Sequence, residues 1–154
     1  MRVLYVDDDD DNRKQFLIAA RIAQVDLDID LAASVDEAET KINGVGQYDM
    51  IVSDVIMPAR KGWELIPKAK KRGFPLVFVT AYTDQAEKDQ HLSGHLVLGK
   101  GMNGSPTQVE LCQAISNGRL AVMAAVDDLS RSADETQIMA RQMTRETGQM
   151  VAHG

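Results

Sequence analysis

Five short apolar segments recur along the chain, and each is followed by a stretch with the apolar spacing of a helix. These segments span residues 2–6, 27–31, 49–53, 75–80 and 95–99. Continuous apolar runs of this length indicate strands buried on both faces, whereas the alternation in the second segment indicates an edge strand. Because parallel strands need long, usually helical crossovers, the order favours a parallel sheet. The pattern predicts an α/β fold: a doubly wound, five-stranded parallel sheet with helices on both faces.

Local signals predict where the intervening helices begin and end. Ser34 and Glu37 form a capping box that opens the second helix. Ser105 and Pro106 are expected to open the fifth helix, and Pro67 is expected to disturb the third helix or to lie in its first turn. The expected helices cover residues 12–24, 34–43, 62–72, 84–92 and a segment from 105 onward.

Polar side chains stand where four of the predicted strands end. They are Asp7 and Asp8 after the first strand, Asp54 after the third, Thr80 at the end of the fourth and Lys100 after the fifth. Because ligands bind beyond the carboxyl ends of parallel strands, we expect these side chains to meet at one edge of the sheet. Convergent carboxylates need a cation, and hard oxygen ligands suit Mg²⁺. A hydroxyl and an ammonium beside that cation suit an anion, so the set predicts a site for phosphoryl transfer.

The remaining acids of the first cluster, Asp9 to Asp11, are interpreted differently. An aspartate near a helix start accepts free backbone N–H groups and suits the helix dipole. We therefore expect these three side chains to cap the first helix or to lie in solvent.

Four parts of the sequence together resemble a known family, the receiver domain of two-component response regulators. They are VDDDDDNR (6–13), SDVIMPARKGWEL (53–65), VTA (79–81) and Lys100. The resemblance covers about residues 1–117 and is to chemotaxis-regulator-like receivers. It implies a flavodoxin-like fold with strand order 2-1-3-4-5.

The resemblance also implies a role for each matching residue. Asp54 would be the phosphoacceptor, whose carboxylate attacks the phosphorus of a phosphohistidine. Asp8 would bind Mg²⁺ directly, Asp7 mainly through water, and Asp54 together with the backbone carbonyl of Ile56 would complete the protein ligands.

Thr80 would donate a hydrogen bond to a phosphoryl oxygen, and Lys100 would pair with another. The implied partners are a sensor histidine kinase or a histidine phosphotransfer protein, and a downstream protein target that reads the phosphorylated state. A shuttle in a phosphorelay fits the same residues. Neither role is that of an enzyme, apart from self-catalysed phosphorylation of the aspartate and slow autodephosphorylation.

The sequence also departs from the family pattern near the site. Gly101 replaces the usual proline after the lysine, and Val97 stands where an aromatic residue often rotates on activation. The stretch Thr80–Lys100 is short by about a residue or two, which trims the fourth helix. Ile56 and Tyr82 replace polar residues that help water to attack the phosphoryl group, so we expect slow autodephosphorylation.

Residues 118–154 are expected to form a helical extension of the receiver domain at 1–117. No glycine or proline occurs from Arg119 to Thr147, and small and apolar residues recur there at heptad spacing up to Met150. Three alternatives stay open. The segment could continue the fifth helix and form a homodimer or bind a partner through 118–150. It could be an amphipathic helix that folds back on the domain or frays, or a linker toward a separate output domain.

Composition narrows the possible functions. The net charge of −6 disfavours a general nucleic-acid binder. No apolar run approaches the ~20 residues of a membrane helix, and the first residues resemble a strand rather than a signal peptide. The lone Cys112 fits a reducing compartment, so we expect a cytoplasmic protein that engages neither nucleic acid nor membrane.

Two other functions are compatible with parts of the sequence. A pseudo-receiver would keep the fold for binding without phosphorylation, in keeping with the departures at Val97 and Gly101. A haloacid-dehalogenase-like phosphatase would use Asp7 and Asp9, but the acidic motif expected after Lys100 is missing, and Asp54 has no role in that family.

Overall fold

The computed structural model describes residues 1–100, 107–121 and 123–124. Its strands form one sheet in the order β2-β1-β3-β4-β5, and every neighbouring pair is parallel. The strands are β1 (Arg2–Val6), β2 (Asp28–Ala32), β3 (Met50–Asp54), β4 (Leu76–Thr80) and β5 (Val97–Gly99). The predicted fold class and strand order are confirmed.

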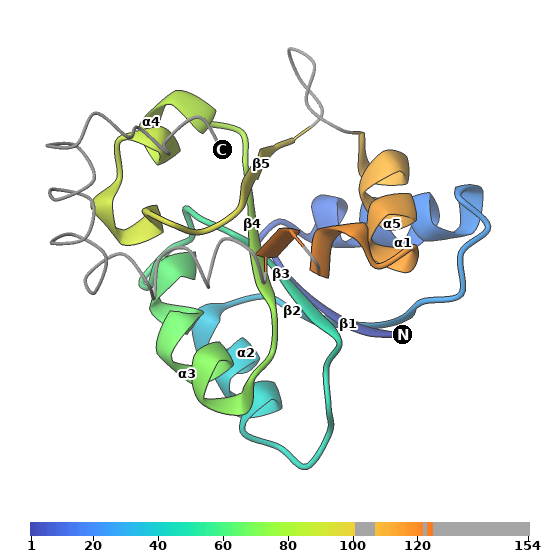
Figure 1. Cartoon of the computed structure of the whole chain (residues 1–154), viewed down its shortest axis with the longest axis horizontal. Helices are drawn as coiled ribbons and strands as arrows, with labels where there is room; N and C mark the ends of the chain where they lie inside the picture. The colour runs from blue at the N-terminus through green and yellow to red at the C-terminus, as the bar shows by residue number, and fades with distance from the viewer. Residues whose placement is uncertain (101–106, 122, 125–154) are drawn as a thin grey trace, which may run out of the picture.

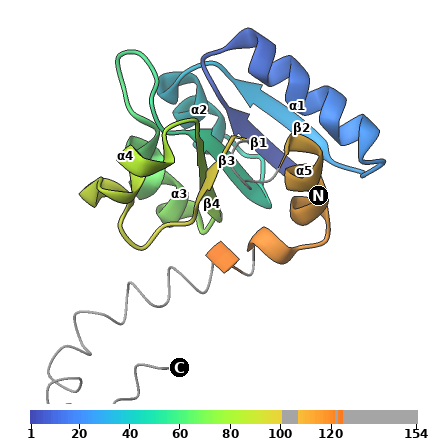
Figure 2. The ribbon, with the colours of Figure 1, turned by 90° about the horizontal axis from the view of Figure 1, so that it is seen from above.

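Helices cover both faces of this sheet (Figures 1 and 2). On one face, α1 (Asp10–Ile22) and α5 (Gln108–Ser116) pack side by side. On the other lie α2 (Val35–Ile42), the 3₁₀ turn η1 (Gly62–Leu65) and α3 (Ile66–Arg72). Each face has its own buried cluster of apolar side chains. Because helices cover both faces, side chains on either side of a central strand are buried, and the central strands therefore contain almost only apolar residues.

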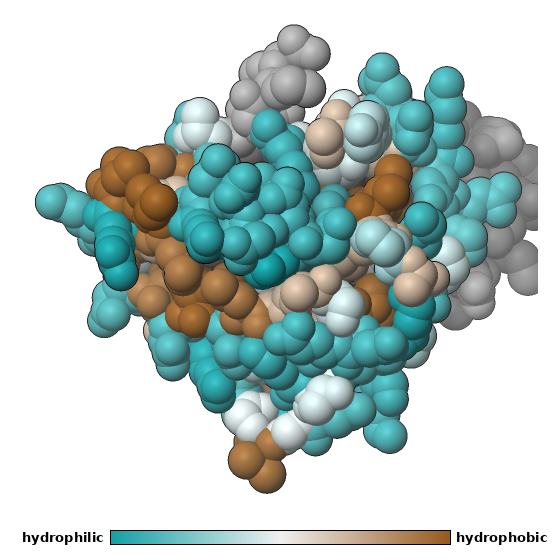
Figure 3. Space-filling view, turned by 180° about the vertical axis from the view of Figure 1, so that it is seen from behind, coloured by the Kyte–Doolittle hydropathy of each residue, from teal (hydrophilic) through white to brown (hydrophobic). Residues whose placement is uncertain are grey.

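Burial follows the predicted positions of the strands. All five residues of β3 and of β4 are buried, as central strands require. Strand β2 is only half-buried along most of its length, which confirms the expected edge strand. Much of the surface in Figure 3 is polar with separate apolar patches, and exposed large apolar side chains include Ile18 and Ile22 of α1.

Two helices differ from their predicted extents because side chains compete for the backbone. The expected helix 84–92 is divided into α4 (Thr83–Glu87) and the 3₁₀ turn η2 (Gln90–Leu92). The Asp89 side chain accepts a hydrogen bond from the His91 amide and so starts a new turn. The fifth helix begins at Gln108 with Thr107 as its N-cap, and the predicted opening residues Ser105 and Pro106 lie outside the described residues.

The first and third helices show the effects of capping and of proline. Asp9 caps α1 by accepting from the Asp11 amide, as expected, so α1 begins two residues earlier than predicted. It ends before Gln24, which adopts a left-handed conformation with φ of 56°. Pro67 lies in the first turn of α3 after a 3₁₀ turn, because proline has no N–H and crowds the preceding turn.

The start of the C-terminal extension packs on the domain. After α5 the chain turns at Gly118, with φ of 78°, and residues 119–121 and 123–124 are helical. Leu120 and Ala124 are buried against the α1–α5 face. The heptad pattern, the expected homodimer and the substitution at Gly101 lie outside the described residues. In the described part, no helix combines the length and apolar character needed to cross a membrane.

Candidate functional site

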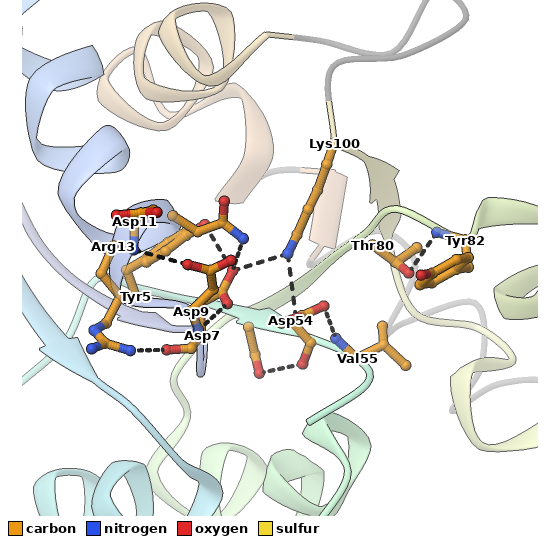
Figure 4. A network of polar contacts seen from close by, with 12 residues as sticks. Tyr5, Asp7, Asp9, Asp11, Arg13, Asp54, Val55, Thr80, Tyr82 and Lys100 are labelled. Carbon is orange, nitrogen blue, oxygen red and sulfur yellow. Dashed lines mark hydrogen bonds and ion pairs between the residues drawn. The ribbon is translucent and has the colours of Figure 1, made fainter. Parts of the chain in front are cut away.

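The carboxyl edge of the sheet holds the predicted polar residues (Figure 4). Asp54 and Thr80 are the last residues of β3 and β4. Backbone pairing continues one residue beyond the other strands: the Asp7 amide donates to the Ala32 carbonyl at 3.1 Å, and the Lys100 amide to the Thr80 carbonyl at 3.0 Å. The register of the sheet therefore fixes the backbone at each of the four strand ends that carry the predicted site residues.

Three carboxylates converge at this edge. Asp7, Asp8 and Asp54 each place an oxygen within 4.8 Å of the others. Asp7 and Asp54 are buried, whereas Asp8 is exposed. Burial raises the pKa of Asp54 to about 6 although Lys100 lowers it, and the nearby Asp7 adds to the rise. The edge is therefore strongly electronegative and needs a counter-charge.

Lys100 supplies a counter-charge for these carboxylates. Its Nζ lies 2.9 Å from Asp7 Oδ2 and 3.3 Å from Asp54 Oδ2, and Figure 4 shows it reaching between the two carboxylates. Burial alone would lower the pKa of Lys100, but its bonds to Asp7 and Asp54 raise the pKa overall. Lys100 therefore stays protonated and ready to pair with an incoming anion.

The donor set fits a magnesium ion. All three candidate ligand groups are carboxylate oxygens, the donors that Mg²⁺ prefers, and the exposed Asp8 leaves one side open to the water that Mg²⁺ retains. No nitrogen or sulfur ligand belongs to this group, which argues against a zinc-type site.

Asp7 is oriented by residues that the sequence reasoning missed. Its carboxylate accepts from the Asp9 amide at 3.0 Å, from Asn12 Nδ2 at 3.3 Å and, at 3.4 Å, from the buried Tyr5 hydroxyl. Arg13 Nη1 donates to the Asp7 carbonyl at 2.7 Å. Because α1 begins at Asp10, its first turn places Asn12 and Arg13 beside Asp7. Recognising Asp9 as the N-cap in the sequence could have predicted this placement.

Asp54 is braced from its own strand and from the following loop. The Val55 amide donates to Asp54 Oδ1 at 2.8 Å, and the Ser53 hydroxyl donates to the Asp54 carbonyl at 2.8 Å. The Gly62 amide donates to the Val55 carbonyl at 2.8 Å. A Cβ atom at Gly62 would lie 1.9 Å from the Asp54 carbonyl oxygen, so only glycine fits there.

Thr80 lies on the other side of Lys100, away from Asp7 (Figure 4). Its buried hydroxyl accepts a hydrogen bond from the Tyr82 amide at 3.0 Å. Tyr82 and Ile56, the residues two positions after Thr80 and Asp54, are 57% and 43% exposed. The structure thus brings Asp7, Asp8, Asp54 and Lys100 together, and gives the Thr80 hydroxyl a partner other than the carboxylates.

Comparison with known proteins gives one family. The sequence model of the response regulator receiver domain matches residues 3–98. No curated protein gives a significant match.

Solved receiver structures have the same fold at modest sequence identity. The receiver domain of the hybrid histidine kinase CckA is 26% identical, with a TM-score of 0.56, over 78% of this chain and 99% of that one. The response regulator TrrA from Thermotoga maritima, in complex with Mg²⁺ and BeF, is 28% identical, with a TM-score of 0.56, over 66% and 88%. Chemotaxis regulator CheY4 of Vibrio cholerae is 25% identical, with a TM-score of 0.58, over 75% and 96%. On the family match, this chain belongs to the response regulator receiver domain family.

Proposed function

We propose that this receiver domain accepts a phosphoryl group on Asp54 from a phosphohistidine and thereby changes its contacts with a downstream protein. The donor would be a sensor histidine kinase or a histidine phosphotransfer protein. The observation that carries the proposal is the meeting of the Asp54 carboxylate with two further carboxylates and the Lys100 ammonium at one edge of the sheet.

Asp54 would be the nucleophile. One of its oxygens forms a bond to phosphorus while the P–N bond to the donor imidazole breaks, and the imidazole leaves with that electron pair and takes up a proton. The reaction needs an ionised carboxylate. With a pKa of about 6, Asp54 is mostly ionised at neutral pH.

Lys100 and Thr80 would stabilise the transferred group. Lys100 exchanges a carboxylate oxygen for a phosphoryl oxygen and keeps an ion pair throughout. The Thr80 hydroxyl is free to rotate about its C–O bond, and it would donate to a second phosphoryl oxygen.

Mg²⁺ would be held by Asp7, Asp8, Asp54 and the Ile56 carbonyl. When bound, it supplies positive charge to the transferring phosphoryl oxygens. The related TrrA was solved with Mg²⁺ and BeF, which supports the choice of ion for a chain that has the same family fold.

Incubation with Mg²⁺ and acetyl phosphate, followed by intact mass spectrometry, tests the proposal. The wild-type protein should gain the mass of one phosphoryl group, and Asp54→Asn, a nearly isosteric control, should gain none. No gain in the wild type would contradict the proposal and favour a pseudo-receiver. Sustained turnover of a generic phosphate ester would instead indicate a phosphatase.

The bulky side chains of Ile56 and Tyr82 support a slow loss of the phosphoryl group, because at these two positions they would shield it from an attacking water. We expect an acyl-phosphate lifetime well beyond seconds, and faster loss in Tyr82→Asn. The measurement is decay of the phosphorylated mass after donor removal. A half-life of seconds in the wild type would refute this prediction.

A further inference from the structure

The loop that joins β3 to η1, residues 55–61, is tied to its surroundings by one arginine. Arg60 Nη1 lies 2.8 Å from Asp36 Oδ1 and also pairs with Glu39, both on α2. Arg60 Nε lies 3.1 Å from Glu64 Oε1 on η1. One guanidinium in the loop therefore bridges two helical elements.

This cluster differs from an ordinary surface ion pair. The Arg60, Glu39 and Glu64 side chains are 33%, 17% and 29% exposed, so solvent screens these pairs only in part, whereas Asp36 is 80% exposed and its pair is the weaker one. Glu64 is itself fixed, because it accepts from the Lys61 amide at 2.7 Å. The three carboxylates raise the pKa of Arg60 above its ordinary value. A planar, permanently charged group with several acidic partners is a specific anchor.

The residue just before the anchor is held in an unfavourable conformation. Ala59 has φ of 65°, in the left-handed region that disfavours residues with a Cβ. The Arg60 amide donates to the Pro58 carbonyl at 2.7 Å, which completes a tight turn. A strained turn persists only where its surroundings determine it, and the Arg60 cluster is such a determinant.

The same loop shapes the acceptor site. It begins at Val55, whose amide holds Asp54 Oδ1, and it closes where the Gly62 amide donates to the Val55 carbonyl. Ile56 follows Val55 directly. The Val55 amide and the Ile56 carbonyl therefore belong to the same short loop whose far end Arg60 fastens to α2.

We propose that Arg60 is a positioning residue for the metal and phosphoacceptor site: by fastening the 55–61 loop to α2, it holds the Ile56 carbonyl and the Val55 amide in place. Arg60 touches none of the reacting groups. The inference rests on the proposed function, and it adds that α2, on one face of the sheet, tunes the affinity of the edge for Mg²⁺.

Calorimetric titration of Mg²⁺ into the full-length, metal-free protein tests this inference. Arg60→Gln should weaken Mg²⁺ binding about tenfold, which is the usual effect of losing a residue that orients metal ligands without touching the metal. Arg60→Lys should recover part of the affinity, because an ammonium keeps the charge but cannot reproduce the fork of a guanidinium. Glu39→Gln should weaken binding in the same direction, and combining it with Arg60→Gln should add little.

Arg72→Gln is the matched control. Arg72 also bridges distant segments, donating to the carbonyls of Ile42, Gly44 and Gly46, but it does so beside the segment that leads into the start of β3. Arg72→Gln and Arg60→Gln should both lower the urea midpoint of unfolding. Only Arg60→Gln should also weaken Mg²⁺ binding. A merely structural role for Arg60 predicts that both arginine variants behave alike.

The outcomes separate the two proposals. If wild-type protein binds no Mg²⁺, the proposed function fails and this inference fails with it. If the wild type binds Mg²⁺ and folded Arg60→Gln binds it equally well, only the inference is overturned. Should Arg60→Gln not fold, the comparison of Glu39→Gln with wild type decides, and unchanged affinity there overturns it.

Discussion

The two halves of the candidate site are built very differently. On the β1–β3 side, Asp7 and Asp54 are buried, Asp54 is braced by Val55 and Ser53, and the following loop is closed and anchored. On the β4–β5 side, β5 has three half-buried residues and α4 only five residues. Fewer buried contacts mean a lower local free energy of opening. The β1–β3 side, called the acceptor half after the proposed role of Asp54, has the fixed geometry that the proposed phosphoryl transfer would need. The β4–β5 half is where a change in structure would cost least.

The largest effect should follow from breaking the acceptor half at Gly62. Gly62→Ala places a methyl group against the Asp54 carbonyl, so the loop must move. We expect a loss of about 4 kcal/mol in the free energy of unfolding, or failure to fold. Urea denaturation followed by circular dichroism measures it.

Gly73→Ala, at the end of α3, is its control. Gly73 needs a left-handed backbone, with φ of 71°, but no atom lies within 4 Å of its added Cβ. Its cost should therefore be only about 1 kcal/mol. Equal losses for the two variants would show that the close approach at Gly62 is not what holds the loop.

The charge on Asp54 should make the metal-free protein less stable as pH rises. Its pKa is about 6 in the fold, above the ordinary value of 3.8, so the folded state binds the proton more tightly than the unfolded chain. The contribution is fully present below about pH 4 and is lost as pH rises through 6, a change of at most about 3 kcal/mol.

Urea titrations between pH 4.5 and 7.5 measure this slope, with Asp54→Asn as the variant that should remove it. Saturating Mg²⁺ should also flatten it, because the cation binds the ionised form. Stability that rose with pH in wild type but not in Asp54→Asn would contradict the assignment.

The β4–β5 half should respond to loss of a ring stack. Trp63 of η1 and His91 of η2 have centroids 3.7 Å apart and an interplanar angle of 5°, and Asp89 Oδ1 lies 2.9 Å from His91 Nδ1. His91→Ala should cost about 1 kcal/mol and change the emission of Trp63, the single tryptophan. His91→Phe keeps an aromatic ring and should retain most of the stability; an unshifted spectrum in His91→Ala would mean that the rings do not stack in solution.

The smallest effect should come from a position outside both halves. Gln24 follows α1 with φ of 56°, where glycine avoids the steric conflict of a side chain. Gln24→Gly should raise the free energy of unfolding by about 0.5 kcal/mol, measured by urea denaturation. Mg²⁺ affinity should not change, and any decrease in stability would refute the geometry at this helix end.

The sequence could predict what depends on local pattern and on general rules of α/β topology. Apolar runs located all five strands, and their carboxyl ends located Asp7, Asp54 and Lys100. Resemblance supplied the strand order. Thr107 as the cap of α5 was missed, because Ser105 and Pro106 offered an equally good local signal.

Contacts between distant segments could not be read from local patterns. Arg60 meets Asp36 across 24 residues, and Trp63 meets His91 across the β4 crossover. Both pairs depend on how η1 packs, which no periodicity encodes. Asp89 could have been recognised as a cap, but the choice between one longer helix and two short turns also depends on tertiary packing, such as the burial of Leu92 in the core.

The burial of Leu120 has a mechanical consequence. Because Leu120 and Ala124 belong to the buried cluster on the α1–α5 face, the helical turn that follows Gly118 is fastened to this face. A turn fastened in this way moves together with α5 rather than independently of it. A small rotation of α5 would therefore displace the chain as far as Ala124 by the same rotation.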